Sequence, residues 1–148
     1  MLVCVLLTWA EPSIVRASCG LELPPRDSIV REFLRPPCER CAGHRGIDYE
    51  TRAGSDVPSV ARGRVSFAGQ VAGRLYVVVD TGALRVTHGG LAAVSVEEGQ
   101  MVASGQVIGV AGSTTYIGVR RGQWYVDPRS CGVRRTRLVS EGDGERHR

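Results

Sequence analysis

The residues best suited to chemistry are His44 and Asp48, which lie four positions apart around Gly46. An imidazole nitrogen and a carboxylate oxygen are both zinc ligands, at about 2.0–2.2 Å in a tetrahedral array. On a straight strand the two Cα atoms would lie about 13 Å apart at ~3.3 Å per residue, so the chain must bend for both groups to reach one ion. Gly46 is able to supply that bend. The spacing predicts the first half of a metal site; the alternative is a chance pair at the start of a strand.

The elements that must position this pair are β-strands. From residue 46 onward, segments rich in Val, Ile, Tyr and Phe alternate with glycine-containing turns, a pattern typical of antiparallel β structure. The run of three valines at 77–79 indicates a strand buried on both faces. The sequence predicts an all-β fold, an antiparallel β-sheet or sandwich in a single domain. The expected strands are 60–67, 75–79, 84–87, 102–110, 116–119 and 124–126.

Length and composition predict one core domain, residues 41–130, between less regular ends. A chain of 148 residues with 43% hydrophobic content buries one core of moderate size. Residues 1–19 begin with an apolar run of signal-peptide length that lacks a positive n-region, so a leader, a weak anchor and a buried strand are alternatives. Residues 20–40 contain two Pro-Pro pairs and predict an extended lead-in. Residues 131–148 are highly charged and are expected to be disordered.

Charge and aromatic content restrict the partners. The net charge of +4 and the pI near 9.0 suit contact with anionic polymers of a cell envelope. Aromatic residues make up only 5% of the chain, which argues against a stacking surface for single-stranded nucleic acid. The N-terminal apolar run is too short to cross a bilayer as a helix. We therefore expect no nucleic-acid partner and no stable membrane span.

The cysteines Cys38 and Cys41 form a C-x-x-C pair just before His44. An oxidising compartment would favour a disulfide, either within the pair or from one member to Cys19 or Cys131. The alternatives are a structural zinc site completed by the nearby His–Asp pair, and free thiols. The sequence does not choose between these pairings.

Four motifs follow one another in a recognisable order from Cys41 to about residue 130. They are H-R-G-I-D at 44–48, T-H-G-G-L at 87–91, V-E-E-G-Q-M-V-A-S-G-Q-V-I-G at 96–109 and G-V-R-R-G-Q-W-Y-V-D-P at 118–128. This order resembles the core domain of the lysostaphin/LytM-type zinc endopeptidases, which cut peptide cross-links in bacterial peptidoglycan. The resemblance implies the β fold of that family, a duplicated hybrid motif, and an extracytoplasmic location.

The resemblance also implies a zinc ion held by His44, Asp48 and the second histidine of a later H-x-H motif. In this chain the two H-x-H positions are Thr114 and Tyr116. Tyr116 would therefore replace the third ligand, and Thr114 a catalytic histidine. A neutral phenol with a pKa near 10 is a poor substitute for imidazole at pH 7, and threonine is no general base near neutrality. We expect metal binding by the remaining pair to be weak or vestigial.

A further catalytic histidine of the family normally precedes the leucine that matches Leu91, and here that position is Gly90. His88 lies two residues earlier. On a regular strand an offset of two keeps the side chain on the same face, so His88 is the one candidate that could rescue catalysis. The alternative is that His88 is a partly exposed residue at the end of a strand, before a turn at Gly89-Gly90.

The segment 96–109 also follows the hairpin pattern of biotinyl and lipoyl carrier domains. A carrier needs a lysine at the tip of a hairpin, and the sequence contains no lysine. The carrier hypothesis is therefore excluded.

The main hypothesis is a non-catalytic, degenerate member of the lysostaphin/LytM-type family, secreted or facing the cell envelope. It would bind peptidoglycan or its peptide stems in the old substrate groove, or engage a cell-wall hydrolase, with no cofactor. The alternatives are an active zinc endopeptidase with an unusual third ligand and a structural envelope protein held together by disulfides. The expected groove residues are His44, Asp48, His88, Thr114 and Tyr116.

Overall fold

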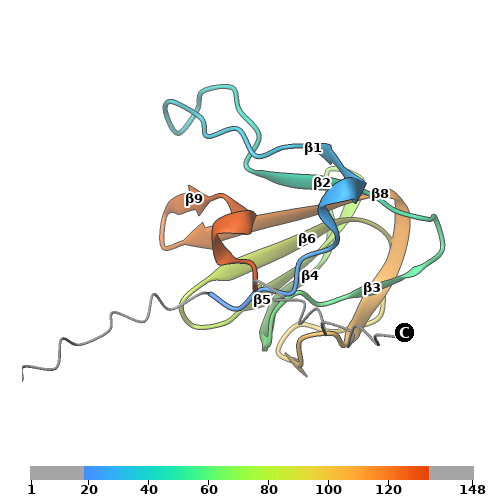
Figure 1. Ribbon diagram of the computed structural model, residues 1–148. Helices are drawn as coiled ribbons and strands as arrows, with labels where there is room; N and C mark the ends of the chain where they lie inside the picture. Colours follow the sequence, from blue (N-terminus) through green and yellow to red (C-terminus); the bar gives the residue numbers. More distant parts are fainter. Residues whose placement is uncertain (1–18, 134–148) are drawn as a thin grey trace, which may run out of the picture.

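The computed structural model describes residues 19–133, so most of the expected leader and tail lie outside the described residues. Apart from two 3-10 turns, the regular elements of this range are all β-strands, and the strand pairs are antiparallel (Figure 1). This confirms the all-β prediction. The elements are η1 (Arg26–Ser28), β1 (Ile29–Arg31), β2 (Gly46–Glu50), β3 (Asp56–Pro58), β4 (Gly63–Val71), β5 (Arg74–Asp80), β6 (Arg85–Val94), β7 (Met101–Val102), β8 (Val107–Arg121), β9 (Trp124–Val126) and η2 (Pro128–Cys131).

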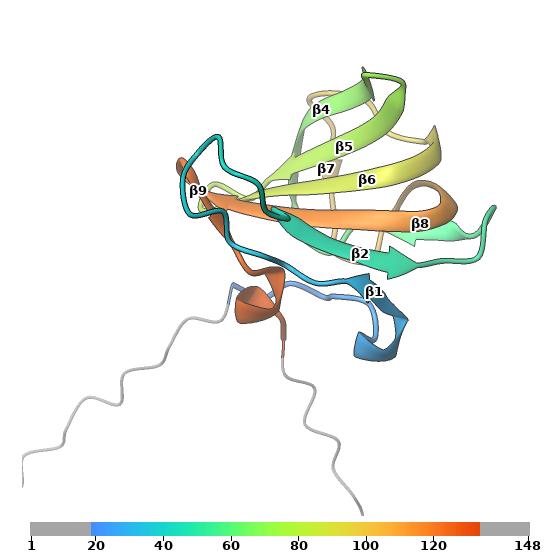
Figure 2. The same cartoon turned by 90° about the horizontal axis from the view of Figure 1, so that it is seen from above.

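The strands form one curved sheet in the order β1-β2-β8-β6-β5-β4-β7 (Figure 2). Strand β8 is the centre of this sheet, because it pairs with β2 and β6 and also with the short strands β3 and β9. Central strands must hydrogen-bond on both edges, and a long Val- and Ile-containing strand meets that demand. The groove described below lies across β8 and its neighbours.

Two strands are longer than the sequence predicts. Strand β8 is one element of 15 residues, where we expected strands at 102–110 and 116–119. Strand β6 runs through Gly89-Gly90, where we expected a turn. The pairing of β6 with β8 shifts register on both sides of Leu91. A β-bulge inserts an extra residue into a strand without ending it, so glycines that resemble a turn in the sequence form a bulge in the sheet.

Two clusters of apolar side chains make the core. One is filled by β4, β5 and the start of β8, including Val65, Val77 and Ile108. The other lies under β2 and the end of β8, including Ile47, Tyr49 and Ile117. Each cluster takes alternate residues of its strands, as the two-residue period of a strand requires. The opposite residues of β2 and β8 are therefore available for a site.

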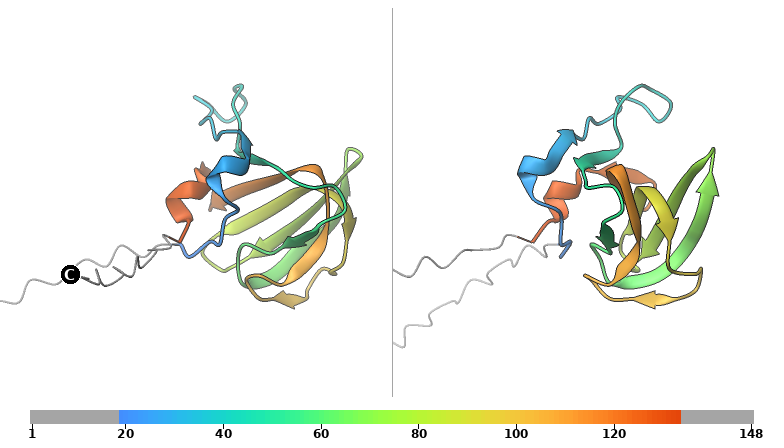
Figure 3. Two further views of the ribbon diagram at one scale, coloured as in Figure 1. Left: turned by 45° about the vertical axis from the view of Figure 1, so that its right-hand side comes forward. Right: turned by 90° about the vertical axis from the view of Figure 1, so that its right-hand side faces the viewer.

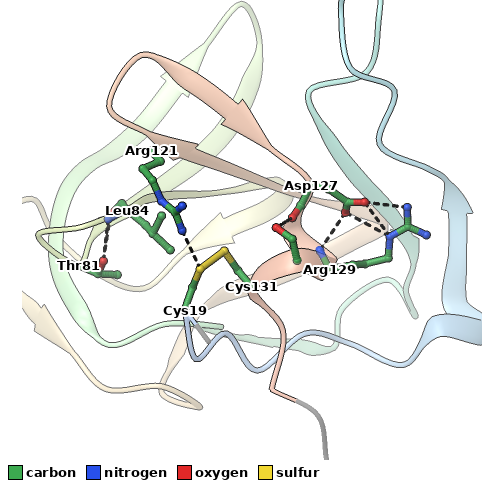
Figure 4. The surroundings of a disulfide bond; sticks show 8 residues. Cys19, Thr81, Leu84, Arg121, Asp127, Arg129 and Cys131 are labelled. Atoms are coloured by element: carbon green, nitrogen blue, oxygen red, sulfur yellow. Dashed lines mark hydrogen bonds and ion pairs between the residues drawn. A yellow bond between two sulfur atoms is a disulfide. The ribbon is translucent and has the colours of Figure 1, made fainter. Parts of the chain in front are cut away.

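A disulfide joins the two ends of the described chain. Cys19 is bonded to Cys131, which is buried in the second core cluster, and the Arg121 guanidinium donates to Cys19 Sγ at 3.2 Å (Figure 4). The lead-in lies beside η2 (Figure 3), with Leu21 bridged to Gly132 in parallel. The residue Cys131, placed by sequence in the charged tail, thus belongs to the folded unit.

The second disulfide is Cys38–Cys41, within the C-x-x-C pair. It lies in the loop between β1 and β2 that leads directly into His44. The disulfide prediction is confirmed, and the structure selects the pairing within the motif over a bond from these cysteines to the chain ends.

Candidate functional site

The site is built on one row of residues that crosses five strands. In register, Arg31 of β1 lies opposite Asp48 of β2, which lies opposite Tyr116 of β8. Tyr116 lies opposite Gly89 of β6, and Gly89 opposite Tyr76 of β5. Directly opposed residues project from the same face of a sheet. The row therefore presents a cation, a carboxylate and two phenols on one face, around a glycine.

His44 and Asp48 meet at the start of β2, since His44 lies two residues before the strand and Asp48 lies within it. His44 Nε2 lies 3.3 Å from Asp48 Oδ2, yet Nε2 is buried and has no hydrogen-bond partner. Its backbone is fixed by two hydrogen bonds to Leu34, at 2.8 and 2.9 Å. Burial lowers the pKa of His44; Asp48 opposes this shift and Arg31 adds to it. A buried imidazole nitrogen that faces a carboxylate without a hydrogen bond is the arrangement expected of two converging ligands.

Tyr116 lies beside this pair, with its ring flat along the sheet. A Cβ placed on Gly118 would meet the Tyr116 hydroxyl, and a Cβ placed on Gly46 would meet its ring. The ring thus lies over two glycines, with its centroid 5.8 Å from that of His44 in an edge arrangement. Gly46 gives the ring space, and it does so without a positive φ. Burial first, then the neighbouring Tyr125, raise the pKa of Tyr116 to about 12.

Gly90 occupies the position where the resemblance expects a histidine. Its φ is +71°, and a Cβ there would overlap the backbone carbonyl of Thr114. Few L side chains adopt this left-handed conformation. The bulge in β6 therefore leaves no space for a histidine side chain at this position.

His88 lies on the other face of the sheet. It is opposite Ile117 of the core, is 1% exposed, and accepts a hydrogen bond from the Val60 N–H at Nε2, 3.1 Å away. Burial lowers its pKa to about 4, while the backbone of Val77 acts in the opposite direction. The structure does not bring His88 to His44 and Asp48. The bulge at Gly89-Gly90 breaks the two-residue period on which that expectation depended.

A groove of about 580 Å³ lies over the row. Of the expected groove residues it contains His44, Asp48, Thr114 and Tyr116, and not His88. The sequence analysis missed the members contributed by β1 and β5. The alternation of Arg74 and Tyr76 around a buried-strand signal could have indicated the members on β5, because both project from one face. The missed lining residues are Arg31, Gly73, Arg74, Tyr76, Gly90, Leu91, Gly112 and Ser113.

Comparison with protein families identifies the domain. The model of peptidase family M23 matches residues 42–128, more than half of the chain. The chain belongs to peptidase family M23. This confirms the resemblance to lysostaphin/LytM-type domains that the motifs indicated.

The uncharacterized protein Rv2891 of Mycobacterium tuberculosis is 31% identical over 161 residues, which cover 96% of this chain and 64% of that protein. The chain thus spans less than two thirds of the curated relatives it matches. Among solved M23-like structures, Helicobacter pylori Csd3 has a TM-score of 0.68 at 29% identity, covering 76% of this chain and 33% of that chain. The SpoIIQ–SpoIIIAH pore forming complex contains a chain with a TM-score of 0.64 at 22% identity. The match covers 76% of this chain and 90% of that chain. Lysostaphin has a TM-score of 0.58 at 18% identity, and the match covers 78% of this chain and 57% of that chain. The last two likenesses concern the fold.

The M23 site of this chain supplies two donors suited to zinc. The orphaned Nε2 of His44 and the adjacent Asp48 oxygen fit two positions of a tetrahedral ion. Tyr116, with its raised pKa and its ring over the glycines, fits the third position poorly. Within residues 19–133 no group of three His, Cys, Asp or Glu side chains is arranged to hold a metal. A catalytic zinc needs three protein ligands and an open position, so the residues present do not fit one.

Proposed function

We propose that this M23 domain is a non-catalytic binding module that engages peptidoglycan or its peptide stems at the cell envelope. The observation that supports this proposal is that the groove is present but lacks the side chains that hydrolysis would need. His44 and Asp48 still converge, while Tyr116, Thr114 and Gly90 occupy the positions of the third ligand and of two catalytic histidines. Substrate binding needs only shape and hydrogen bonds, whereas hydrolysis also needs an activated water.

The covalent structure supports an extracytoplasmic location. Two disulfides are stable in an oxidising compartment and rare in the bacterial cytosol. None of the helices within residues 19–133 is long and apolar enough to cross a membrane. We infer an extracytoplasmic location, where peptidoglycan and cell-wall hydrolases are both within reach.

Sedimentation of the purified chain with sacculi tests the binding function. We expect the chain to sediment with sacculi in the presence of a metal chelator and to release no peptide from them. Thr114→Trp should abolish binding, because Thr114 is exposed and lines the groove. The matched control Glu98→Trp places the same ring on an exposed turn after β6 and should bind normally. Equal sedimentation of both variants, or none by the parent chain, would reject the proposal.

One observation favours a second candidate, a zinc endopeptidase with an unusual third ligand. The buried Nε2 of His44 has no hydrogen-bond partner, and an unpaired buried nitrogen costs about 1–3 kcal/mol unless a ligand satisfies it. Metal analysis after dialysis against trace zinc separates the two. One zinc per chain, lost in His44→Ala, would establish the zinc site; no retained zinc supports the binding module.

A further inference from the structure

Two arginines stand on opposite sides of the groove. Arg31 is the last residue of β1 and Arg74 the first residue of β5, and both are exposed and line the groove. The ion pairs found within the described part of the chain involve other cations. Within this part of the chain no carboxylate pairs with either guanidinium. Both are therefore available to a ligand.

A single carboxylate lies between them. Asp48 is the register partner of Arg31, forms no ion pair with it, and its side chain is 21% exposed. The fixed charges across the groove therefore run positive, negative, positive. The best complement is a ligand whose charges run negative, positive, negative.

The dimensions and the remaining lining suit a short peptide. Strands β1 and β5 are separated by β2, β8 and β6 (Figure 2), so their axes are roughly 19 Å apart along the sheet at about 4.8 Å per strand. The distance between the strand axes is an upper limit for the ligand, because the Arg31 and Arg74 side chains both line the groove. An extended peptide of four residues, about 13 Å long at ~3.3 Å per residue, is therefore long enough to contact both. Ser113 and Thr114 offer hydroxyls, and Tyr76 and Leu91 offer apolar surface.

We propose that the groove recognises an acidic peptide in which an ammonium group lies between two carboxylates. This inference rests on the proposed function and specifies its ligand as a peptidoglycan stem that is not cross-linked. A stem with a free diamino acid carries this pattern, and acylation of its side-chain amine by cross-linking removes the ammonium charge. Asp48 would repel a continuous polyanion such as a phosphate polymer, which distinguishes the two ligand classes.

Calorimetry on the full chain tests the charge pattern directly. The probe is the stem peptide N-acetyl-L-Ala-γ-D-Glu-diaminopimelate-D-Ala. It is compared with the form that is also acetylated at the side-chain amine of diaminopimelate, and with the form that is amidated at the α-carboxylate of D-Glu. We expect binding to weaken at least tenfold for each modified peptide, since a charge-assisted hydrogen bond is lost in each case. Equal affinity for all three peptides would overturn the inference.

Variants assign the charges to residues. Arg74→Gln and Arg31→Gln should each weaken binding of the free-acid peptide about tenfold. Arg62→Gln, at an exposed arginine outside the groove lining, should not change it. Asp48→Asn should remove the discrimination against the N-acetyl peptide. An equal effect of Arg62→Gln and Arg74→Gln would contradict the assignment.

Sacculus sedimentation separates the two levels of the proposal. If the chain sediments with sacculi but does not distinguish the three peptides, the charge-reading inference fails and the binding function stands. If it neither sediments nor binds any peptide, the binding function itself fails. Binding of a phosphate polymer in preference to the peptide would also overturn the inference.

Discussion

The two faces of the sheet each carry one histidine, and each has one disulfide nearby. On the core face His88 is fully buried, and Cys131 of the long-range disulfide packs in the same core. On the groove face His44 is partly exposed and follows the loop closed by Cys38–Cys41. Both imidazoles have a nitrogen without a hydrogen-bond partner and a lowered pKa. The difference in burial shows that one histidine supports the fold and the other belongs to a site.

The largest expected contrast is between the two disulfides. The Cys19–Cys131 bond spans a sequence separation of 112, and Cys38–Cys41 a separation of 3. A cross-link stabilises by removing loop-closure entropy from the unfolded chain, about 4–5 kcal/mol for the long loop and about 2 kcal/mol or less for the short one. Urea unfolding of the double variants Cys19→Ala/Cys131→Ala and Cys38→Ala/Cys41→Ala measures both. A larger loss for the short loop would mean that the C-x-x-C loop, and not the joined chain ends, holds the domain together.

The two histidines should also contribute unequally to stability, with the larger loss expected for the substitution on the core face. His88→Ala leaves a cavity in the core and an unsatisfied Val60 N–H, which together cost about 3–4 kcal/mol. His44→Ala removes a partly exposed ring from the groove, and we expect a loss within about 1 kcal/mol. Equilibrium unfolding of the two variants makes the comparison. Equal losses would show that the groove face is as important to stability as the core face.

Much of the fold could be predicted from local patterns, and the failures share one cause. Alternation and glycine turns located the strands, and the H-x-x-x-D spacing located the pair that converges in the structure. The face of His88 could not be predicted, because a bulge at Gly89-Gly90 depends on pairing with β8. Arg31 was missed for a similar reason, since the short strand β1 exists only through its pairing with β2. Long-range pairing, not residue type, decides these positions.

The pH dependence of stability should come from the buried histidine. The pKa of His88 falls from an ordinary 6.5 to about 4 in the folded chain, so between these values the unfolded state binds a proton that the folded state does not. Stability is therefore full above pH 6.5, decreases as the pH falls, and levels off below about 4. The shift corresponds to about 3 kcal/mol. Urea unfolding measured across this pH range should show a free energy of unfolding that decreases as the pH falls in the parent chain and in His44→Ala. The same decrease should be absent in His88→Leu.

The smallest effect we expect is a gain on the groove face. Tyr116→His places an imidazole opposite Asp48 in the register of β2 and β8, and so adds a third donor to His44 and Asp48. We expect one zinc per chain, with a stabilisation of about 2.7 kcal/mol at a hundredfold excess of zinc over its Kd. Tyr76→His is the matched control, because Gly89 separates Tyr76 from Tyr116 along the row.

This variant should bind zinc without cutting peptidoglycan. Thr114 still stands where the family resemblance expects one catalytic histidine, and the left-handed backbone of Gly90, against the Thr114 carbonyl, leaves no space for the other. Metal analysis and a peptide-release assay on sacculi separate binding from turnover. Peptide release by Tyr116→His would mean that the third ligand alone distinguishes this chain from an active enzyme. Zinc binding without release would instead show that a third ligand is not sufficient for hydrolysis, as the bulge in β6 and the threonine at position 114 predict.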